Sequence, residues 1–431
     1  MQTDLLRKKT PQIRTIDSID LPNPTHFQLD NGVETWCINS GEQPVLKIDL
    51  IFKAGSIFGK NPLTSQITNL CLREGTKSYS SEQIAEIFDS CGASLNMHSN
   101  RDDARITLFC LTKHLNTLMP VLAEVVLSPI FPENEIKTVA ENARQDFLVE
   151  MQKVKFISRR NFGRLVFGND HIYSRYEDVV DYENINREDL LGFYQQFYES
   201  ARFRIIASGK IPNDIRQTIN KHFGKHRVLK QNPRPEGTVE PSQAKGVHFF
   251  EKADSLQSGL NIGKILFNLR HSDYNRMKVV STILGGYFGS RLMANIREDK
   301  GFTYGIHSMT TSSQHAGLFH ISTQVGTEVT QAALEEILKE IELLRSAQVK
   351  KSELELVKNY MSGLLQQQAD GPFAQGEMLK TMLDYQLDFS YYKKYLETIK
   401  TVTIEEIQDL AVKYLDPNTM LSVVVGSNNK R

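Results

Sequence analysis

An internal repeat constrains the fold of this sequence more than any other feature. Residues 185–209 and 402–426 match at an offset of 217, and each combines a polar helix start, apolar residues at helical spacing and an apolar run ending in glycine. Residues 111–126 and 325–341 match at an offset of 214, each after an alternating segment. The first pair predicts a helix followed by a strand, and the second predicts a strand followed by a helix. The chain is therefore predicted to consist of two copies of one structural unit.

A linker separates the two predicted copies. Residues 229–246, "LKQNPRPEGTVEPSQAKG", contain three prolines and almost no apolar residues, a composition typical of linkers. We therefore expect a first half over residues 1–228 and a second half over residues 247–431. Because each half interleaves alternating strands with long helices, the predicted class is α+β, with helices on one face of a mostly antiparallel sheet.

Composition excludes several classes of function. The 431 residues include 51 Lys plus Arg and 51 Asp plus Glu, so no net charge favours nucleic acid or an anionic membrane as the partner. The N-terminal segment lacks an apolar run of signal-peptide length, and no apolar stretch approaches the roughly 20 residues of a membrane span. The four cysteines form no CxxC pair, which predicts buried, reduced thiols. We expect a cytoplasmic protein without a membrane span.

Three motifs of the second half and one of the first carry a family resemblance. They are "DSLQSGLNIG" (254–263), "LGGYFGSRLMANIRE" (284–298), "KGFTYG" (300–305) and "REGTKSYSSEQIAEIFDSCGASLN" (73–96). Taken in this order, they resemble the M16 (insulinase and pitrilysin-like) metallopeptidases, in particular the short group with the mitochondrial processing peptidase subunits and bacterial relatives. The resemblance implies the LuxS/MPP-like metallohydrolase fold, in which the two homologous halves form one valve of a clam-shaped chamber.

The metal motif of active family members is degenerate here. Those members carry HxxEH, which ends five residues before the glycine of a "GT" pair, and its two histidines bind zinc while the glutamate acts as general base. Counting back from Gly75 places Gln66, Asn69 and Leu70 at these positions. None of the three side chains can do this chemistry near neutral pH. The third ligand of the family would fall near Asp146, and one carboxylate cannot hold catalytic zinc. We expect this chain to bind no metal.

A second set of residues, an arginine and a tyrosine, matches the family motif position by position. Arg297 and Tyr304 stand seven residues apart on either side of Gly301. A simpler reading makes Arg297 a helix-terminal residue favoured by the helix dipole, with Gly301 as the cap and Tyr304 on an alternating strand. In the family, the equivalent Arg and Tyr stabilise the substrate carbonyl and the oxyanion formed on attack. The resemblance therefore implies that Arg297 and Tyr304 are catalytic residues acting together with a partner chain.

These expectations combine into one functional prediction. The chain is predicted to be the zinc-free subunit of a heterodimeric M16-type peptidase, inactive alone, whose homologous partner carries HxxEH and zinc and whose substrate is a peptide or unfolded polypeptide. Three alternatives remain: a catalytically idle scaffold, a peptide-binding homodimer without catalysis, and an autonomous zinc peptidase with substituted ligands. The sequence does not decide which peptide is cleaved.

Overall fold

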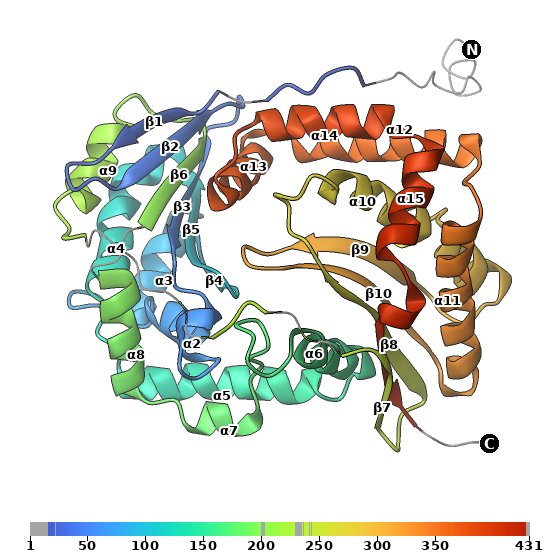
Figure 1. Cartoon of the computed structure of the whole chain (residues 1–431). Helices are drawn as coiled ribbons and strands as arrows, with labels where there is room; N and C mark the ends of the chain where they lie inside the picture. The colour runs from blue at the N-terminus through green and yellow to red at the C-terminus, as the bar shows by residue number, and fades with distance from the viewer. Residues whose placement is uncertain are drawn as a thin grey trace, which may run out of the picture.

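Two β-sheets, each with its own set of helices, make up the molecule (Figure 1). The computed structural model describes residues 16–21, 23–199, 203–228, 235, 237–240, 242 and 244–427. Of the predicted linker, residues 229–234, 236, 241 and 243 lie outside the described residues. None of the helices in the described ranges is long and apolar enough to cross a membrane.

The first sheet has six strands in the order β1-β2-β6-β3-β5-β4. Their bounds are β1 Thr25–Gln28, β2 Glu34–Asn39, β3 Val45–Phe52, β4 Ser94–Ser99, β5 Ala104–Leu111 and β6 Phe203–Gly209. All neighbours pair antiparallel except β2 and β6, which are parallel. The central strand β3 is buried along nearly its whole length, as expected where helices cover both of its faces.

The second sheet has five strands in the order β7-β11-β8-β10-β9. Their bounds are β7 Gly246–Glu251, β8 Gln257–Leu266, β9 Ile306–Ser312, β10 Gly317–Gly326 and β11 Leu421–Gly426. Only β7 and β11 are parallel. This order and these directions repeat those of β2-β6-β3-β5-β4, so the two halves share one topology and the predicted repeat is confirmed.

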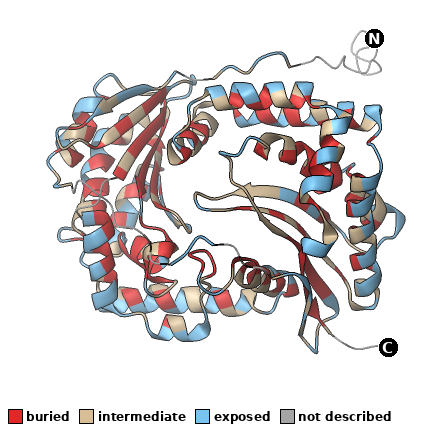
Figure 2. Cartoon of the chain, viewed as in Figure 1, coloured by how far each residue is buried: buried red, intermediate tan, exposed pale blue. Residues whose placement is uncertain are grey.

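Helices of each half pack on the sheet of that half and enclose a hydrophobic core (Figure 2). In the first half they are α2 Thr64–Cys71, α3 Ser81–Ser90, α4 Leu115–Leu127, α5 Glu133–Glu150, α7 Val179–Glu183, α8 Arg187–Tyr194 and α9 Ile215–Phe223. In the second half they are α10 Tyr274–Ser281, α11 Thr330–Ser346, α12 Lys351–Gln368, α14 Ser390–Thr401 and α15 Ile404–Tyr414. Short 3₁₀ and π segments are η1 Ser56–Phe58, η2 Thr112–His114, η3 Gln195–Glu199, η4 Thr282–Gly286, η5 Met293–Asp299, η6 Thr327–Val329 and η7 Pro417–Thr419. The predicted α+β class is confirmed.

Local sequence signals explain individual helices. Helix α3 begins with a capping box, in which the Ser80 hydroxyl accepts from the Gln83 N–H and the Gln83 side chain accepts from the Ser80 N–H. This arrangement satisfies two donors that a helix start otherwise leaves unpaired.

The predicted reduced thiols are also confirmed, since all four cysteines are free and three of them are buried.

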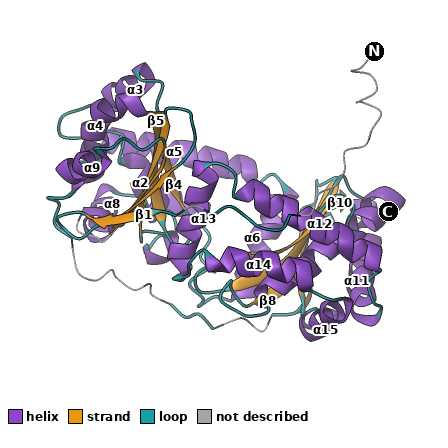
Figure 3. Ribbon diagram, turned by 90° about the horizontal axis from the view of Figure 1, so that it is seen from above, coloured by secondary structure: helices purple, strands orange, loops and turns teal. Residues whose placement is uncertain are grey.

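Each half contributes one helix to the sheet of the other half. Helix α6 (Val154–Phe167) packs on β8 and β11 of the second sheet, and α13 (Pro372–Tyr385) packs on β6 and β2 of the first (Figures 1 and 3). Gly259 makes one of these contacts possible, because a Cβ there would lie 2.5 Å from the Val154 carbonyl oxygen. Beside it, the Asn261 side-chain amide donates to the Ser158 hydroxyl over 2.8 Å. The sequence repeat did not predict this exchange, which adds a helix to the second face of each sheet.

Candidate functional site

Helix α2 holds the three positions where the resemblance predicts the degenerate metal motif. Gln66 is exposed, Leu70 is half-buried, and Asn69 is 1% exposed. The Asn69 amide is fully engaged in packing, because its Nδ2 donates to the Arg105 carbonyl over 3.4 Å and its Oδ1 accepts from the Tyr198 hydroxyl over 3.2 Å. The residue at the general-base position therefore stabilises the fold and is unavailable to a water molecule or a substrate.

The fourth predicted position does not complete a metal site. Asp146 lies on α5, which packs against α2, and its side chain is exposed. Across the described part of the chain, no three His, Cys, Asp or Glu side chains are placed to hold one metal ion. A zinc site needs at least three such donors, so the residues present do not fit zinc.

Arg297 lies on η5, half-buried, with its guanidinium carbon 4.6 Å from the centre of the Phe288 ring. No carboxylate pairs with it among the residues that the structure describes. After Lys300 the chain turns through Gly301, which has a φ of +65°, and the Phe302 N–H then donates to the Ile296 carbonyl over 2.9 Å. The predicted glycine turn is therefore present, and the Arg297 guanidinium forms no hydrogen bond with the residues that the structure describes.

Tyr304 is almost completely exposed, at 95%. The sequence predicted a strand here, but residues 300–305 form an irregular segment that precedes β9. Its backbone is nevertheless fixed, because the Thr303 hydroxyl donates to the Gln324 and Gly305 carbonyls over 2.7 and 3.0 Å. A fixed backbone with a free phenol is unusual for so large a side chain, which normally buries most of its ring.

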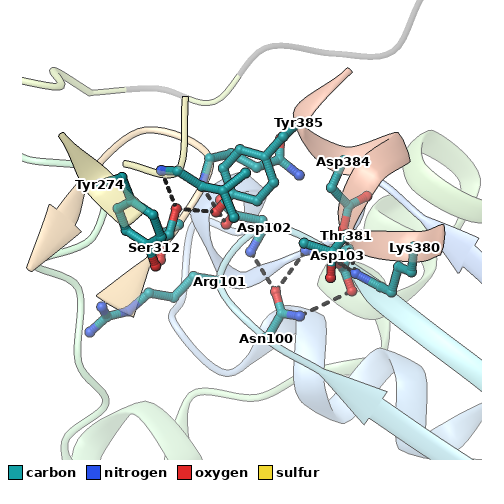
Figure 4. Close-up of a pocket in the computed structure, with 13 residues that line it drawn as sticks. Asn100, Arg101, Asp102, Asp103, Tyr274, Ser312, Lys380, Thr381, Asp384 and Tyr385 are labelled. Carbon is teal, nitrogen blue, oxygen red and sulfur yellow. Dashed lines mark hydrogen bonds and ion pairs between the residues drawn. The ribbon is translucent and has the colours of Figure 1, made fainter. Parts of the chain in front are cut away.

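A cleft of about 450 Å³ lies where the two halves meet, and the sequence did not predict it. Residues 100–103 of the β4–β5 turn, residues 312–314 of the β9–β10 hairpin and the end of α13 line it (Figure 4). Within it, the Ser312 and Tyr385 hydroxyls lie 2.6 Å apart. Its wall combines apolar and polar side chains, and the Asp103–Lys380 ion pair in it joins the two halves.

Lys380 of α13 is central to these ion pairs. Its Nζ lies 2.7 Å from Asp103 Oδ2 and 2.7 Å from Asp384 Oδ2 (Figure 4). Burial lowers the pKa of Lys380, but the two carboxylates outweigh it and raise the pKa. One turn earlier, Glu377 contacts Lys47 over 2.5 Å and Arg105 over 2.7 Å. Helix α13 is thus held on the first sheet by matched charges.

A hydrogen-bonded chain crosses the same boundary beside Lys380. The Tyr173 hydroxyl donates to Asp102 Oδ1 over 2.6 Å and accepts from the His315 N–H over 3.1 Å, while the Gln314 N–H donates to Asp102 Oδ2 over 3.3 Å. Burial raises the pKa of Asp102, and the Tyr173 hydrogen bond only partly offsets this effect. The hydrogen bonds from the Gln314 and His315 N–H groups tie the β9–β10 hairpin to the first half, and the Tyr173–Asp102 hydrogen bond joins their two acceptors.

Fold and site together define a doubled α+β protein of the metallopeptidase type whose metal helix carries no ligands. The chain belongs to the M16 peptidase family: residues 37–161 match the model described as "Insulinase (Peptidase family M16)", and residues 184–361 match "Peptidase M16 inactive domain".

Individual relatives carry different names. The chain is 24% identical over 302 residues, 68% of its own length and 71% of the relative's, to "Uncharacterized zinc protease YmxG" of Bacillus subtilis. It is 23% identical over 401 residues, 90% of each chain, to "Non-peptidase homolog YmxG" of Helicobacter pylori. In fold it is similar to a crystal structure of a "peptidase M16 inactive domain" from Pseudomonas fluorescens, with a TM-score of 0.83, 24% identity and coverage of 94% and 98% of the two chains.

Proposed function

We propose that this chain is the zinc-free subunit of a heterodimeric M16-type peptidase. In this proposal, Arg297 and Tyr304 stabilise the substrate carbonyl and the oxyanion, while a homologous partner with HxxEH provides zinc and the general base. The observation that carries the proposal is the combination of a cation without a carboxylate partner among the described residues and a phenol that is 95% exposed. Neither group contributes its polar atoms to the fold, which leaves both for a ligand.

The arrangement of Arg297 suits stabilisation of a developing negative charge. The Phe288 ring packs on the face of the guanidinium, so the cation is oriented without being neutralised. The N–H donors at its edge stay free to meet an oxygen atom. A fixed donor of this kind contributes about 2.7 to 4 kcal/mol to transition-state stabilisation, which corresponds to about 10² to 10³ in kcat.

The chain cannot launch the attack on the carbonyl by itself. Gln66, Asn69 and Leu70 supply neither zinc ligands nor a base, and the Asn69 amide is already hydrogen-bonded within the fold. The reaction therefore requires the partner chain, and the isolated protein should show no peptidase activity. A peptide or an unfolded polypeptide is the substrate class that this division of roles implies.

A reconstituted complex tests the proposal. The chain is co-purified with a candidate HxxEH-bearing neighbour, and peptide hydrolysis is measured for the wild type and for Arg297→Ala and Tyr304→Phe. We expect each variant to lower kcat at least tenfold, about 1.4 kcal/mol or more, with the zinc content of the partner unchanged. Arg276→Ala and Tyr360→Phe are matched controls on the same half, since Arg276 forms partly exposed ion pairs and Tyr360 is 40% exposed.

A second candidate is an idle scaffold or peptide-binding protein, which the relative named as a non-peptidase homologue favours. In that case, the complex would form without activity, or the complex would be active with turnover unaffected by either substitution. Binding of a peptide without cleavage, measured on the isolated chain, would then identify the peptide-binding form of this alternative.

A further inference from the structure

A second pocket, of about 240 Å³, lies beside the degenerate metal helix and is rich in arginine. Gln66 of α2 forms part of its wall, and α6, the β4–β5 turn and the segment before α7 form the remainder. Its charged lining residues are Arg101, Arg159, Arg160, Arg175 and Glu177. Four guanidinium groups and one carboxylate therefore meet in the space next to the position where active relatives bind zinc.

Three of these arginines have no carboxylate partner among the described residues. Arg101 donates to the Tyr176 hydroxyl and lies against three aromatic rings, with centroids 5.0 to 5.6 Å from its guanidinium carbon. In Figure 4 its guanidinium points away from Lys380 and toward the other side of the turn. Arg175 donates to the Gly59 carbonyl over 2.8 Å. Arg159 is exposed, and its guanidinium carbon lies 5.6 Å from the centre of the Phe156 ring of α6.

Arg160 supplies an independent observation at the same place. Its side chain is 5% exposed and contacts Asp178 Oδ1 over 2.6 Å. The Asp178 carboxylate is shared with Arg164, which contacts Oδ2 over 2.8 Å. Within the described structure, the buried Nε of Arg160 has no hydrogen-bond partner. A buried donor without a partner costs about 1 to 3 kcal/mol, so the wall of this pocket has an unmet need for an acceptor.

Charge and size point to a small oxyanion. Three guanidinium groups without a described carboxylate partner repel one another around one space unless an anion or solvent lies between them, and the planar fork of guanidinium matches carboxylate and phosphate oxygens. The volume of about 240 Å³ is smaller than the sites of drug-sized ligands. We propose that this pocket binds a small oxyanion, either the free carboxylate end of a peptide or a phosphate-sized ion.

The proposed anion site is independent of the proposed peptidase function. It is formed by residues of the first half, including those of α6, whereas Arg297 and Tyr304 lie in the second half. Its test therefore needs only the full-length chain, without a partner, and a failed peptidase assay leaves the prediction unchanged.

Calorimetric titration of the full chain tests the site. The probes are inorganic phosphate, a short peptide with a free C-terminal carboxylate, and the same peptide as its C-terminal amide. We expect phosphate or the free-acid peptide to bind, and Arg159→Gln to weaken that binding at least tenfold. Arg216→Gln is the matched control, because Arg216 is also an exposed helical arginine stacked on a phenylalanine, at 5.4 Å compared with 5.6 Å for Arg159. Arg175→Lys keeps the charge but loses the fork, and we expect weaker binding with an unchanged melting temperature.

The outcomes separate the two sources of the anion. Binding of the free acid but not of the amide, with competition by phosphate or without it, supports a peptide carboxylate as the ligand. Binding of phosphate alone supports a free ion. The site is refuted if neither probe binds with a Kd below about 1 mM, if Arg159→Gln binds as the Arg216→Gln control does, or if acid and amide bind equally and phosphate does not bind.

Discussion

Lys380→Met should cost stability because it removes the charge that joins α13 to the first half. The Lys380 ammonium lies between Asp103 and Asp384, and the three side chains are only 15%, 6% and 10% exposed. Removing one partner of a buried ion pair destabilises by about 3 to 5 kcal/mol. The lower end applies here, because Asp384 keeps its ion pair with Arg204 and Asp103 keeps a hydrogen bond from the Asn100 amide.

Thermal unfolding converts this free energy into a measurable shift. An unfolding entropy of about 2.1 cal/mol/K per residue gives about 0.9 kcal/mol/K for 431 residues, so about 3 kcal/mol lowers Tm by about 3 °C. The measurement belongs near pH 7. Because the folded-state pKa of Lys380 is raised, its stabilising contribution is complete below the unfolded value of about 10.4 and is lost only as the pH rises through the folded value.

Lys339→Met is the matched control for this experiment. Lys339 also pairs with a carboxylate, Glu336, over 3.4 Å, but its side chain is 62% exposed. Exposed pairs contribute about 0 to 1 kcal/mol, so the control should change Tm by about 1 °C at most. If Lys380→Met melts with its control, the ion pairs of α13 do not hold the halves together and our account of the interface is wrong.

Three further predictions concern the same molecule. Tyr173→Phe should destabilise by about 1 to 3 kcal/mol, because it leaves Asp102 and the His315 N–H without their buried partner; denaturant unfolding with an unchanged midpoint would contradict this. Burial raises the pKa of Glu377, but Lys47 and an arginine of β5 lower it overall. The Tm deficit of Glu377→Gln should therefore be present at pH 7 and shrink as the pH falls below about 4.3, and a deficit independent of pH would be the contrary result in parallel melts. A chelator should leave the Tm of the isolated chain unchanged, whereas a rise in Tm with added zinc, confirmed by elemental analysis, would show that the chain holds a metal after all.

Most of the fold could be predicted from the repeat, because apolar residues recur at clear helix and strand periods in both copies. Apolar residues alternate along β10 and recur at helical spacing along α11, and each pattern indicates which face of the element is buried. Both patterns are present in the local sequence. The segment around Tyr304 was predicted less well. Its "GFTYG" letters fit a strand, but hydrogen bonds from Thr303 to the Gly305 carbonyl and to the Gln324 carbonyl of β10 fix an irregular path instead. The contact with β10 is tertiary and leaves no local pattern.

In the candidate site, the sequence suggested only those positions that the spacing of a family motif specifies. Counting back from Gly75 along the family motif placed Gln66, Asn69 and Leu70 at the metal positions, and this placement stays a prediction. The cleft between the halves gave no such signal. Glu377 and Lys380 lie three residues apart on α13, a spacing that is typical of a solvent-exposed helix face. They contact the first sheet because α13 packs on the sheet of the other half.

Two neighbouring pockets, which share Asn100 and Arg101, differ in how their charges are matched. Helix α13 brings Glu377 and Asp384 to lysines and arginines of the first half, and the charges match. Helix α6 has the equivalent role on the second sheet, and its Arg159 and Arg160 line a pocket together with Arg101 and Arg175; of these four, only Arg160 pairs with a carboxylate among the described residues. Unmatched charge in a confined space is expensive, so this wall is stable only with solvent or an anion between its cations. The β4–β5 turn thus lies between a pocket with matched charges and a cationic pocket, and the cationic pocket is where a ligand of this chain should first be sought.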